Sequence, residues 1–439
     1  MRKTILTTVA LAIAAAILAG LASAGSAPTR NSLSGAFVRR PPAAGPDVVT
    51  DWNRTMIAGL EAANPPPPMA SRIGAIVQTS VFDAVNGIER RYASIHVEPA
   101  APRGASRAAA AASAAYTALV ALIPAQKPIF DQQLDATLAQ ITHDPSDPDQ
   151  SVVRGLDWGT TVANDILAWR ANDGINAALP PYVPGTAPGD YQPTPPLFGP
   201  PLFRQFANMT PFALKSPSQF LPAGPPPLSS PRYARDLAEV QALGSATSTV
   251  RTPEQTQTAV FWQVDTPAAM WNRVADDLAD ANGTTMTQDA RLLALMNIGL
   301  ADATIGIWNA KNHFDAWRPV TAIRASLDPN WTPLLATPAF QEYPSAHAGV
   351  SAAAATVLAS FYGNHTSFTV TSAGLPGVER DFDSFSSSVS QIEDARIYAG
   401  FHFRFSCVDG AVLGASVGAY VLSHAARPVH GRRAGRRNG

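Results

Sequence analysis

The sequence predicts an all-α protein in which two packed helical bundles are joined by a long proline-rich loop region. Three observations lead to this fold class. Apolar residues recur at helical spacing over most of the chain, no stretch alternates with period two for long enough to require a sheet, and a proline-rich segment separates two sets of helical patterns. A chain of 439 residues, 46% hydrophobic and 15% charged, can bury a core of this size.

The N-terminus has the pattern of a secretory signal peptide. Arg2 and Lys3 precede an apolar run over residues 5–21, and three small residues, 22–24, follow it. We expect residues 1–24 to be removed and the mature chain to be secreted or periplasmic, with a retained membrane anchor as the alternative. We find no second apolar run of about 18 residues, so we expect no stable membrane insertion after signal cleavage.

Charge and cysteine content narrow the function classes. The net charge of −1 argues against nucleic-acid binding, and we interpret the basic tail over residues 428–439 as a solvated end. Residues 25–48 are rich in Pro, Gly, Ser and Ala without periodicity and are expected to be flexible. The single cysteine, Cys407, has no second thiol to pair with, and we interpret it as a small buried apolar side chain.

Residues 49–173 form the predicted N-terminal bundle. The four prolines at 65–68 end its first helix, and apolar positions recur at helical spacing in the next. The helices expected here cover residues 51–63, 69–90, 105–122, 125–141 and 148–171.

Residues 174–231 change sharply in composition to Pro, Gly, Thr, Phe and Tyr. Loops of this length are usually functional or linking. The aromatic content indicates that this segment packs onto the protein and shapes a pocket entrance. A plain connection between the bundles is an alternative that is at least as well supported.

Residues 232–427 form the predicted C-terminal bundle, which we expect to hold an oxyanion site. Its segment 287–311 leaves almost no polar face, as in a helix buried inside a bundle. The helices expected here cover residues 232–242, 252–262, 267–280, 287–311, 345–362, 388–399 and 408–425.

A histidine stands at the mouth of one of these helices. Ser345 is a good N-cap, His347 follows it, and the Ala-rich run to residue 362 is strongly helix-forming. Free backbone N–H groups and the helix dipole at such an end favour an anion. We therefore expect the hydroxyl, the first amides and the imidazole to face one pocket that suits a tetrahedral oxyanion.

Two bases precede this helix mouth. Because Pro319 disfavours helix at the residue before it, we expect Arg318 at the end of the buried helix, two turns or roughly 10 Å beyond Lys311. Taken alone, both residues would be interpreted as ordinary surface bases. Their place on an otherwise apolar helix indicates instead that they share a bound anion, since an unpaired buried charge is costly.

Arg396 and His402 form the third element. On one continuous helix their side chains would point about 120° apart, so convergence on one site requires a break, which Gly400 can provide. Alone, the segment would be interpreted as an amphipathic helix with an incidental histidine. As the third cluster of the same kind, it predicts a further wall of the anion site.

Together the three elements resemble the three-part signature of the vanadium-dependent haloperoxidases and the type 2 phosphatidic acid phosphatase superfamily. The matching segments are 311–319, 344–347 and 396–402. Several positions outside the signature resemble the soluble bacterial haloperoxidase branch, namely Trp52, Asn53, residues 69–72 and 82–86, Phe261, Trp262, Asp265 and Trp308.

The resemblance implies a vanadate cofactor, with phosphate able to occupy the same site. It implies that Lys311, Arg318 and Arg396 neutralise the equatorial oxygens, and that Ser345 and the amide of Ala346 donate hydrogen bonds to them.

The resemblance also implies the catalytic roles. His402 would be the axial ligand of the vanadium, His347 the acid/base that assists peroxide binding, and Lys311 the group that polarises the bound peroxide. The implied reaction partners are hydrogen peroxide, a halide and a small organic acceptor.

Two residues depart from the family pattern. Ala346 stands where the family usually has glycine, which adds a methyl group beside the anion but keeps the backbone donor. Ser406 stands where many bacterial relatives carry an aspartate, so a carboxylate beside the third element is missing unless Asp265 or Asp409 replaces it. Phe340, near the position associated with the halide side, is interpreted equally as a pocket residue or as a core aromatic.

The predicted activity is that of a vanadium-dependent haloperoxidase. An acid phosphatase is the alternative, in which His402 attacks a phosphoryl group and His347 protonates the leaving oxygen. A non-catalytic oxyanion-binding relative is the third hypothesis, because of the departures at Ala346 and Ser406.

Overall fold

The computed structural model describes residues 47–142 and 149–429. The predicted signal peptide and nearly all of the predicted flexible segment and basic tail lie outside the described residues. Within them the chain forms thirteen α-helices, two short 3-10 helices (η1, Pro124–Gln126, and η2, Arg204–Asn208) and one two-stranded ribbon. The all-α prediction is confirmed.

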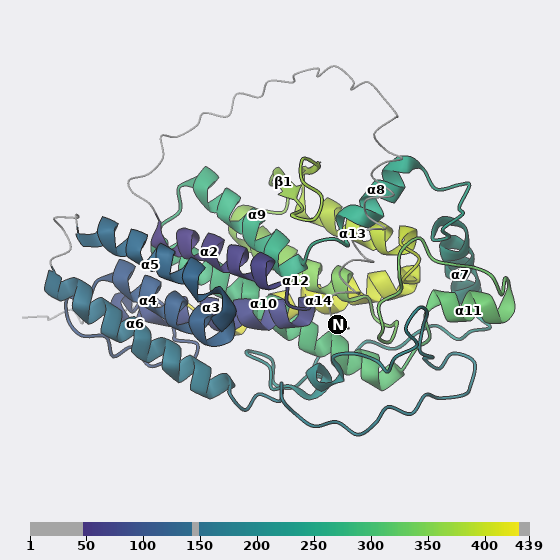
Figure 1. Cartoon of the computed structure of the whole chain (residues 1–439), viewed down its shortest axis with the longest axis horizontal. Helices are drawn as coiled ribbons and strands as arrows, with labels where there is room; N and C mark the ends of the chain where they lie inside the picture. The colour runs from purple at the N-terminus through teal and green to yellow at the C-terminus, as the bar shows by residue number, and fades with distance from the viewer. Residues whose placement is uncertain (1–46, 143–148, 430–439) are drawn as a thin grey trace, which may run out of the picture.

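Five helices gather at one end of the molecule (Figure 1). The second of them begins inside the proline run, two residues earlier than predicted, because a proline in the first helical turn lacks only an N–H that would have no partner there. The five are α2 (Val48–Ala63), α3 (Pro67–Glu89), α4 (Arg107–Leu122), α5 (Lys127–Thr142) and α6 (Asp149–Arg170).

The remaining helices form the other bundle. Several begin with a proline that follows a serine or threonine N-cap; at α8, Thr252 and Gln255 form a full capping box. These helices are α7 (Pro231–Leu243), α8 (Pro253–Phe261), α9 (Pro267–Asn282), α10 (Met286–Phe314), α11 (Pro319–Ser326), α12 (Ala346–Tyr362), α13 (Phe385–Tyr398) and α14 (Arg404–His424).

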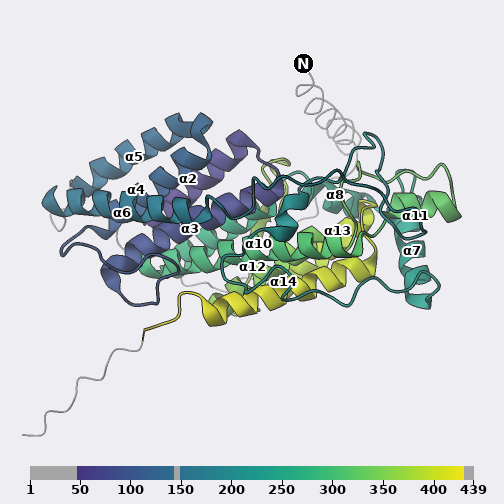
Figure 2. The ribbon, with the colours of Figure 1, turned by 90° about the horizontal axis from the view of Figure 1, so that it is seen from below.

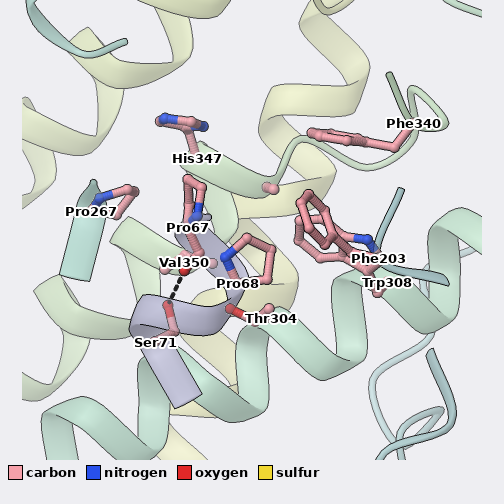
Figure 3. Close-up of a pocket in the computed structure, with 11 residues that line it drawn as sticks. Pro67, Pro68, Ser71, Phe203, Pro267, Thr304, Trp308, Phe340, His347 and Val350 are labelled. Atoms are coloured by element: carbon pink, nitrogen blue, oxygen red, sulfur yellow. Dashed lines mark hydrogen bonds between the residues drawn. The ribbon is translucent and has the colours of Figure 1, made fainter. Parts of the chain in front are cut away.

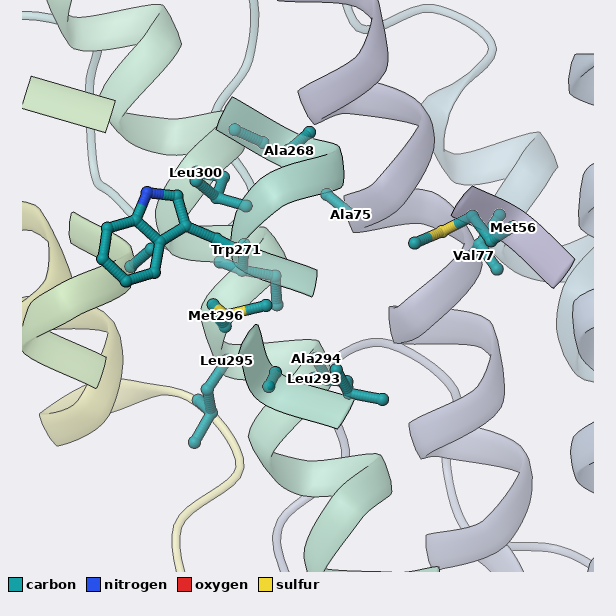
Figure 4. Packing of buried hydrophobic residues seen from close by; sticks show 14 of the residues in the cluster. Met56, Ala75, Val77, Ala268, Trp271, Leu293, Ala294, Leu295, Met296 and Leu300 are labelled. Carbon is teal, nitrogen blue, oxygen red and sulfur yellow. The ribbon is translucent and has the colours of Figure 1, made fainter. Parts of the chain in front are cut away.

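Helix α10 is the central element of the molecule. It packs against α3 of the first bundle and against α12 and α14 of the second, which run beside it (Figures 1 and 2). Figure 4 shows Leu293, Met296 and Leu300 of this helix in the same buried cluster as Trp271 of α9 and Ala75 of α3. The near absence of a polar face on α10 is explained by its burial on all sides.

Two described helices are long and apolar enough to cross a membrane by length and composition, which corrects the expectation of no second apolar run. In α10, 94% of the most apolar window is buried inside the protein, whereas in α14 the buried share is 50%. The bent pair formed by residues 107–122 and 124–141 meets the same criterion when taken as one span.

Helix α11 and the ribbon were not predicted. Strands β1 (Phe368–Thr371) and β2 (Glu379–Phe382) pair antiparallel, with Phe368 opposite Phe382. Phe368 also stacks on Phe385 of α13, with ring centroids 4.8 Å apart. Elements of four to eight residues are too short to show a hydrophobic period, so tertiary packing determines them.

The proline-rich connector packs onto the second bundle. The buried carboxylate of Asp302 in α10 accepts hydrogen bonds at 2.6–2.9 Å from three successive connector amides, those of residues 212–214. Near residue 190 the connector also pairs with the segment between Lys311 and Arg318: the amide of Tyr191 donates to Asp315 at 2.6 Å and that of Trp317 to Gly189 at 2.8 Å. The connector therefore holds the segment that carries both bases.

Glycines bring α14 unusually close to α12. A Cβ atom at Gly414 would lie 1.8 Å from the carbonyl oxygen of Gly349, and one at Gly410 would lie 2.5 Å from that of Ser345. The amide of Ser345 in turn donates to the carbonyl oxygen of Ser406 at 3.1 Å. This approach sets the start of α14 beside the start of α12.

We expect Gly414→Ala to lower the stability of the protein by about 1–3 kcal/mol, because the added methyl group overlaps backbone atoms that cannot move independently. Thermal unfolding followed by circular dichroism measures the change. Gly199→Ala is the matched control, since a Cβ atom there meets nothing within 4 Å. Equal melting temperatures for the two variants would contradict this account of the interface.

Candidate oxyanion site

Five of the predicted site residues meet inside the second bundle, where five helix ends converge. Lys311 lies in the last turn of α10, Arg318 and Ser345 are the N-cap residues of α11 and α12, Arg396 lies in the last turn of α13, and His402 lies just before α14. All five side chains are buried, at 0–2% exposure.

The position of Arg318 corrects the prediction that it ends the helix of Lys311. Helix α10 runs to Phe314 and ends at Asp315, whose φ of 45° is left-handed, and Arg318 instead caps α11. Its extended backbone is the conformation that a following proline favours. Its side chain donates to the carbonyl oxygens of Phe340 at 2.8 Å and Phe401 at 3.0 Å.

The predicted break at Gly400 is present. Helix α13 ends at Tyr398, Gly400 adopts a φ of 82°, and α14 begins at Arg404. A Cβ atom at Gly400 would also lie 2.6 Å from the carbonyl oxygen of Gly244, so glycine is required for space as well as for conformation. The break lets Arg396 and His402 face the same interior region.

Several buried polar atoms at this place have no hydrogen-bond partner in the protein. They are Arg318 Nη2, Arg396 Nε and Nη1, Ser345 Oγ and His347 Nε2. More than about 90% of buried polar groups in folded proteins are paired, so a cluster of orphan donors indicates a missing acceptor. An oxyanion, which accepts several hydrogen bonds at once, fits this donor set.

Lys311 and Gln263 complete the set around the two arginines. The ammonium of Lys311 donates to the carbonyl oxygens of Gln341 at 2.7 Å and Glu342 at 2.8 Å, which leaves one of its three N–H groups. Arg396 Nη2 donates to the side-chain oxygen of Gln263 at 2.8 Å. Gln263, which precedes α9, was not among the predicted site residues, although its neighbours Phe261, Trp262 and Asp265 were noted.

The site holds more positive than negative charge. Burial and the neighbouring Arg318 lower the pKa of Lys311 well below its usual value, and burial lowers the pKa of Arg318 to about 10 and of Arg396 to about 9. Burial raises the pKa of the one carboxyl group within this cluster of described residues, that of Glu342, to about 7. An anion bound beside the three bases would restore their charged forms.

Both histidines are neutral in this setting. Burial, followed by the positive charge of the neighbouring bases, lowers the pKa of His347 and of His402 well below the usual value. His402 Nε2 lies 3.2 Å from Arg318 Nη1, and His402 Nδ1 lies 2.8 Å from Glu342 Oε1. Because a guanidinium only donates, Nε2 must carry the lone pair and Nδ1 the proton.

A small apolar pocket of about 60 Å³ adjoins the anion site (Figure 3). His347 and Phe340 line one side of it, and Trp308 lies against Phe340 with ring centroids 5.3 Å apart. The Phe340 ring also lies 5.2 Å from Lys311 Nζ and 4.9 Å from Arg318 Cζ. These contacts favour the interpretation of Phe340 as a pocket residue over that of a core aromatic.

The other pocket walls come from outside the three predicted elements. Pro67, Pro68 and Ser71 of α3 belong to the first bundle, and Phe203 belongs to the connector (Figure 3). Ala346 lines the same space, so its methyl group takes up room there, as the departure from glycine predicts. The pocket thus lies between the two bundles.

The structure corrects the predicted replacements for the missing aspartate at Ser406. Asp265 pairs with Arg273, and Asp409 accepts a hydrogen bond from the Tyr343 hydroxyl at 2.7 Å. The carboxylate that contacts His402 is that of Glu342, which was not among the predicted site residues. The only sequence feature that pointed to Glu342 was its place two residues before Pro344, and this feature does not identify His402 as its partner.

Comparisons with known proteins match both the site and the fold. A family model described as the VCPO second helical-bundle domain matches residues 291–431, which contain all three elements. Vanadium chloroperoxidase from Curvularia inaequalis is 27% identical over 241 residues, covering 40% of this chain and 39% of that protein. The match thus spans about two fifths of the length of that relative.

Solved structures extend the likeness over most of the chain. The first bacterial vanadium-dependent iodoperoxidase superposes with a TM-score of 0.78 at 25% identity, covering 90% of this chain and 100% of that one. A holo-type bacterial vanadium-dependent chloroperoxidase, with a TM-score of 0.65 at 18% identity over 83% and 94% of the two chains, shares the fold. The chain is therefore similar to the vanadium haloperoxidases, in sequence over residues 291–431 and in fold over 90% of its length.

Proposed function

We propose that this protein is a secreted vanadium-dependent haloperoxidase that oxidises halide with hydrogen peroxide and halogenates organic acceptors. The observation that carries the proposal is the cluster of unpartnered polar atoms on Arg318, Arg396, Ser345 and His347 beside the lone pair of His402. The signal-peptide pattern at the N-terminus supports secretion.

The residues present fit a vanadate. Lys311, Arg318 and Arg396 would neutralise its oxygens, Ser345 Oγ and the backbone N–H of Ala346 would donate to it, and Nε2 of His402 would hold the vanadium. When bound, the vanadate supplies the centre at which peroxide is activated toward attack by halide. Preorganised donors of this kind stabilise charge that develops on the oxygens without having to reorient during the reaction.

His347 is suited to move the proton. It is neutral, its Nε2 has no partner, and it lines the pocket beside Phe340. A neutral imidazole beside Arg396 and Lys311 would accept a proton from incoming peroxide. Lys311, with one N–H group left, would be the nearby donor that polarises the peroxide oxygen.

The pocket supports a reaction between small species. Its volume of about 60 Å³ accommodates molecules of the size of water, peroxide or a halide ion. Pockets that enclose an organic ligand usually measure about 300–1,000 Å³. The organic acceptor therefore reacts outside this pocket.

The phosphatase alternative rests on one specific observation. His402 is neutral, carries its lone pair on Nε2, and has a carboxylate on Nδ1, which is the arrangement of an activated imidazole nucleophile. The same donors would hold a phosphoryl group.

Reconstitution separates these functions. We expect the mature protein, loaded with orthovanadate, to halogenate a dye in the presence of peroxide and bromide or iodide, and to hydrolyse an aryl phosphate slowly if at all. His402→Ala should abolish the activity. Hydrolysis without vanadate, together with no halogenation of any halide, would favour the phosphatase, and tight oxyanion binding without either activity would favour a non-catalytic protein.

Arg396→Met should weaken the binding of vanadate by about 10- to 100-fold, because a charge-assisted hydrogen bond to a buried anion contributes about 1.5–3 kcal/mol. Isothermal titration calorimetry with the purified protein measures this change. The matched control is Arg54→Met, which removes an exposed arginine paired with Asp51 and Asp280 on the first bundle. If both variants bind vanadate as the parent does, Arg396 does not contact the anion.

A further inference from the structure

Glu342 is a buried carboxylate to which the proposed haloperoxidase function assigns no role. It lies in the loop before α12 with 0% exposure, and its Oε1 is 2.8 Å from His402 Nδ1 and 3.1 Å from the amide of Phe403. Its own amide donates to the carbonyl oxygen of Ala316 at 3.0 Å, and its carbonyl oxygen accepts from Lys311. The loop is thus held at both backbone groups, which fixes where the carboxylate points.

The two ring nitrogens of His402 have different neighbours: Arg318 at Nε2 and Glu342 at Nδ1. Arg318 can only donate, so it requires the lone pair on Nε2; a carboxylate can accept the proton of Nδ1. Only this tautomer satisfies both contacts. A histidine that binds a metal through one nitrogen commonly donates its other N–H to a carboxylate, which fixes the ring and raises the basicity of the bound nitrogen.

A second element reaches the same nitrogen. Ser406, one helical turn after His402 on α14, has its Oγ 3.5 Å from Nδ1, at the limit of a hydrogen bond and without charge. A carboxylate at position 406 would arrive at Nδ1 from α14, whereas Glu342 arrives from the loop before α12. The two positions are therefore alternative sources of one carboxylate for one imidazole.

We propose that Glu342 is the positioning residue of His402, which holds the Nδ1–H tautomer and keeps the Nε2 lone pair directed at the anion site in place of a carboxylate at position 406. The inference rests on the proposed oxyanion function. It differs from that function in predicting a discrimination between anions. A bound vanadate would take up the lone pair of Nε2, whereas a bound phosphate at equilibrium would be held by charge and hydrogen bonds alone.

The test compares the binding of vanadate and phosphate to the full chain and to Glu342→Met. Removing the carboxylate leaves the three bases less neutralised, so phosphate should bind at least as tightly as before. The affinity for vanadate should fall about 10- to 100-fold relative to the affinity for phosphate, which is the usual effect of removing a residue that hydrogen-bonds to a metal-binding histidine. Ser406→Asp added to Glu342→Met should restore most of the ratio of vanadate affinity to phosphate affinity, because it returns a carboxylate to Nδ1 from α14.

Glu254→Met is the matched control, since its side chain is 69% exposed and pairs with Arg380; it should leave the ratio unchanged. Glu342→Gln, which keeps an acceptor oxygen without the charge, should lie between the parent and Glu342→Met, and it serves if the methionine variant does not fold. An unchanged ratio in the folded Glu342 variants, or no recovery in a folded double variant, would overturn the proposal.

Nitrogen NMR of the parent chain without vanadate gives an independent reading. With ¹⁵N-labelled histidine, the signals lost in His402→Ala identify this ring, and we expect its Nδ1 to be protonated and its Nε2 bare. A protonated Nε2 would overturn the assignment. Because neither the tautomer nor the binding ratio depends on turnover, a failure here is distinguishable from an absence of halogenation.

Discussion

The burial of three bases at one point is the constraint on which the rest of the structure depends. Removing Lys311, Arg318 and Arg396 from water is unfavourable unless each finds partners inside the protein. The protein supplies backbone carbonyl oxygens to Lys311 and Arg318 and an amide oxygen to Arg396. Carbonyl dipoles do not cancel the charge of the three bases, so the site favours the binding of an anion.

The three bases lie at or near helix ends rather than on helix faces. This placement explains the glycines and the connector contacts around the site. The glycines of α14 allow its first turn to approach Ser345, and Gly400 turns the chain between Arg396 and His402. The connector pairs with the short segment between Lys311 and Arg318. Each of these contacts fixes the relative position of two elements. A site built from several segments is most easily distorted at such junctions.

The sequence was sufficient for the long helices and for the three charged elements, because periodicity and residue spacing act over a few turns. Helix α11 and the β1–β2 ribbon were missed because each is too short to show a period. The contact between Glu342 and His402 was missed for a different reason. The two residues lie 60 positions apart, and a local sequence pattern does not predict which carboxylate contacts a given imidazole. Asp265 and Asp409 were equally reasonable choices until the packing excluded them.

The departure at Ala346 bears on the choice between the two chemistries. Its methyl group occupies pocket space but leaves the backbone donor, so it changes the size of the site and not its charge. A phosphatase must seat the leaving group of its ester next to the anion, whereas peroxide and halide are little larger than water. A pocket of about 60 Å³, walled by Phe340, Trp308 and the prolines of α3, disfavours the bulky leaving group far more than the small reactants. Pocket size, which the charged signature does not encode, is therefore an argument for the proposed haloperoxidase.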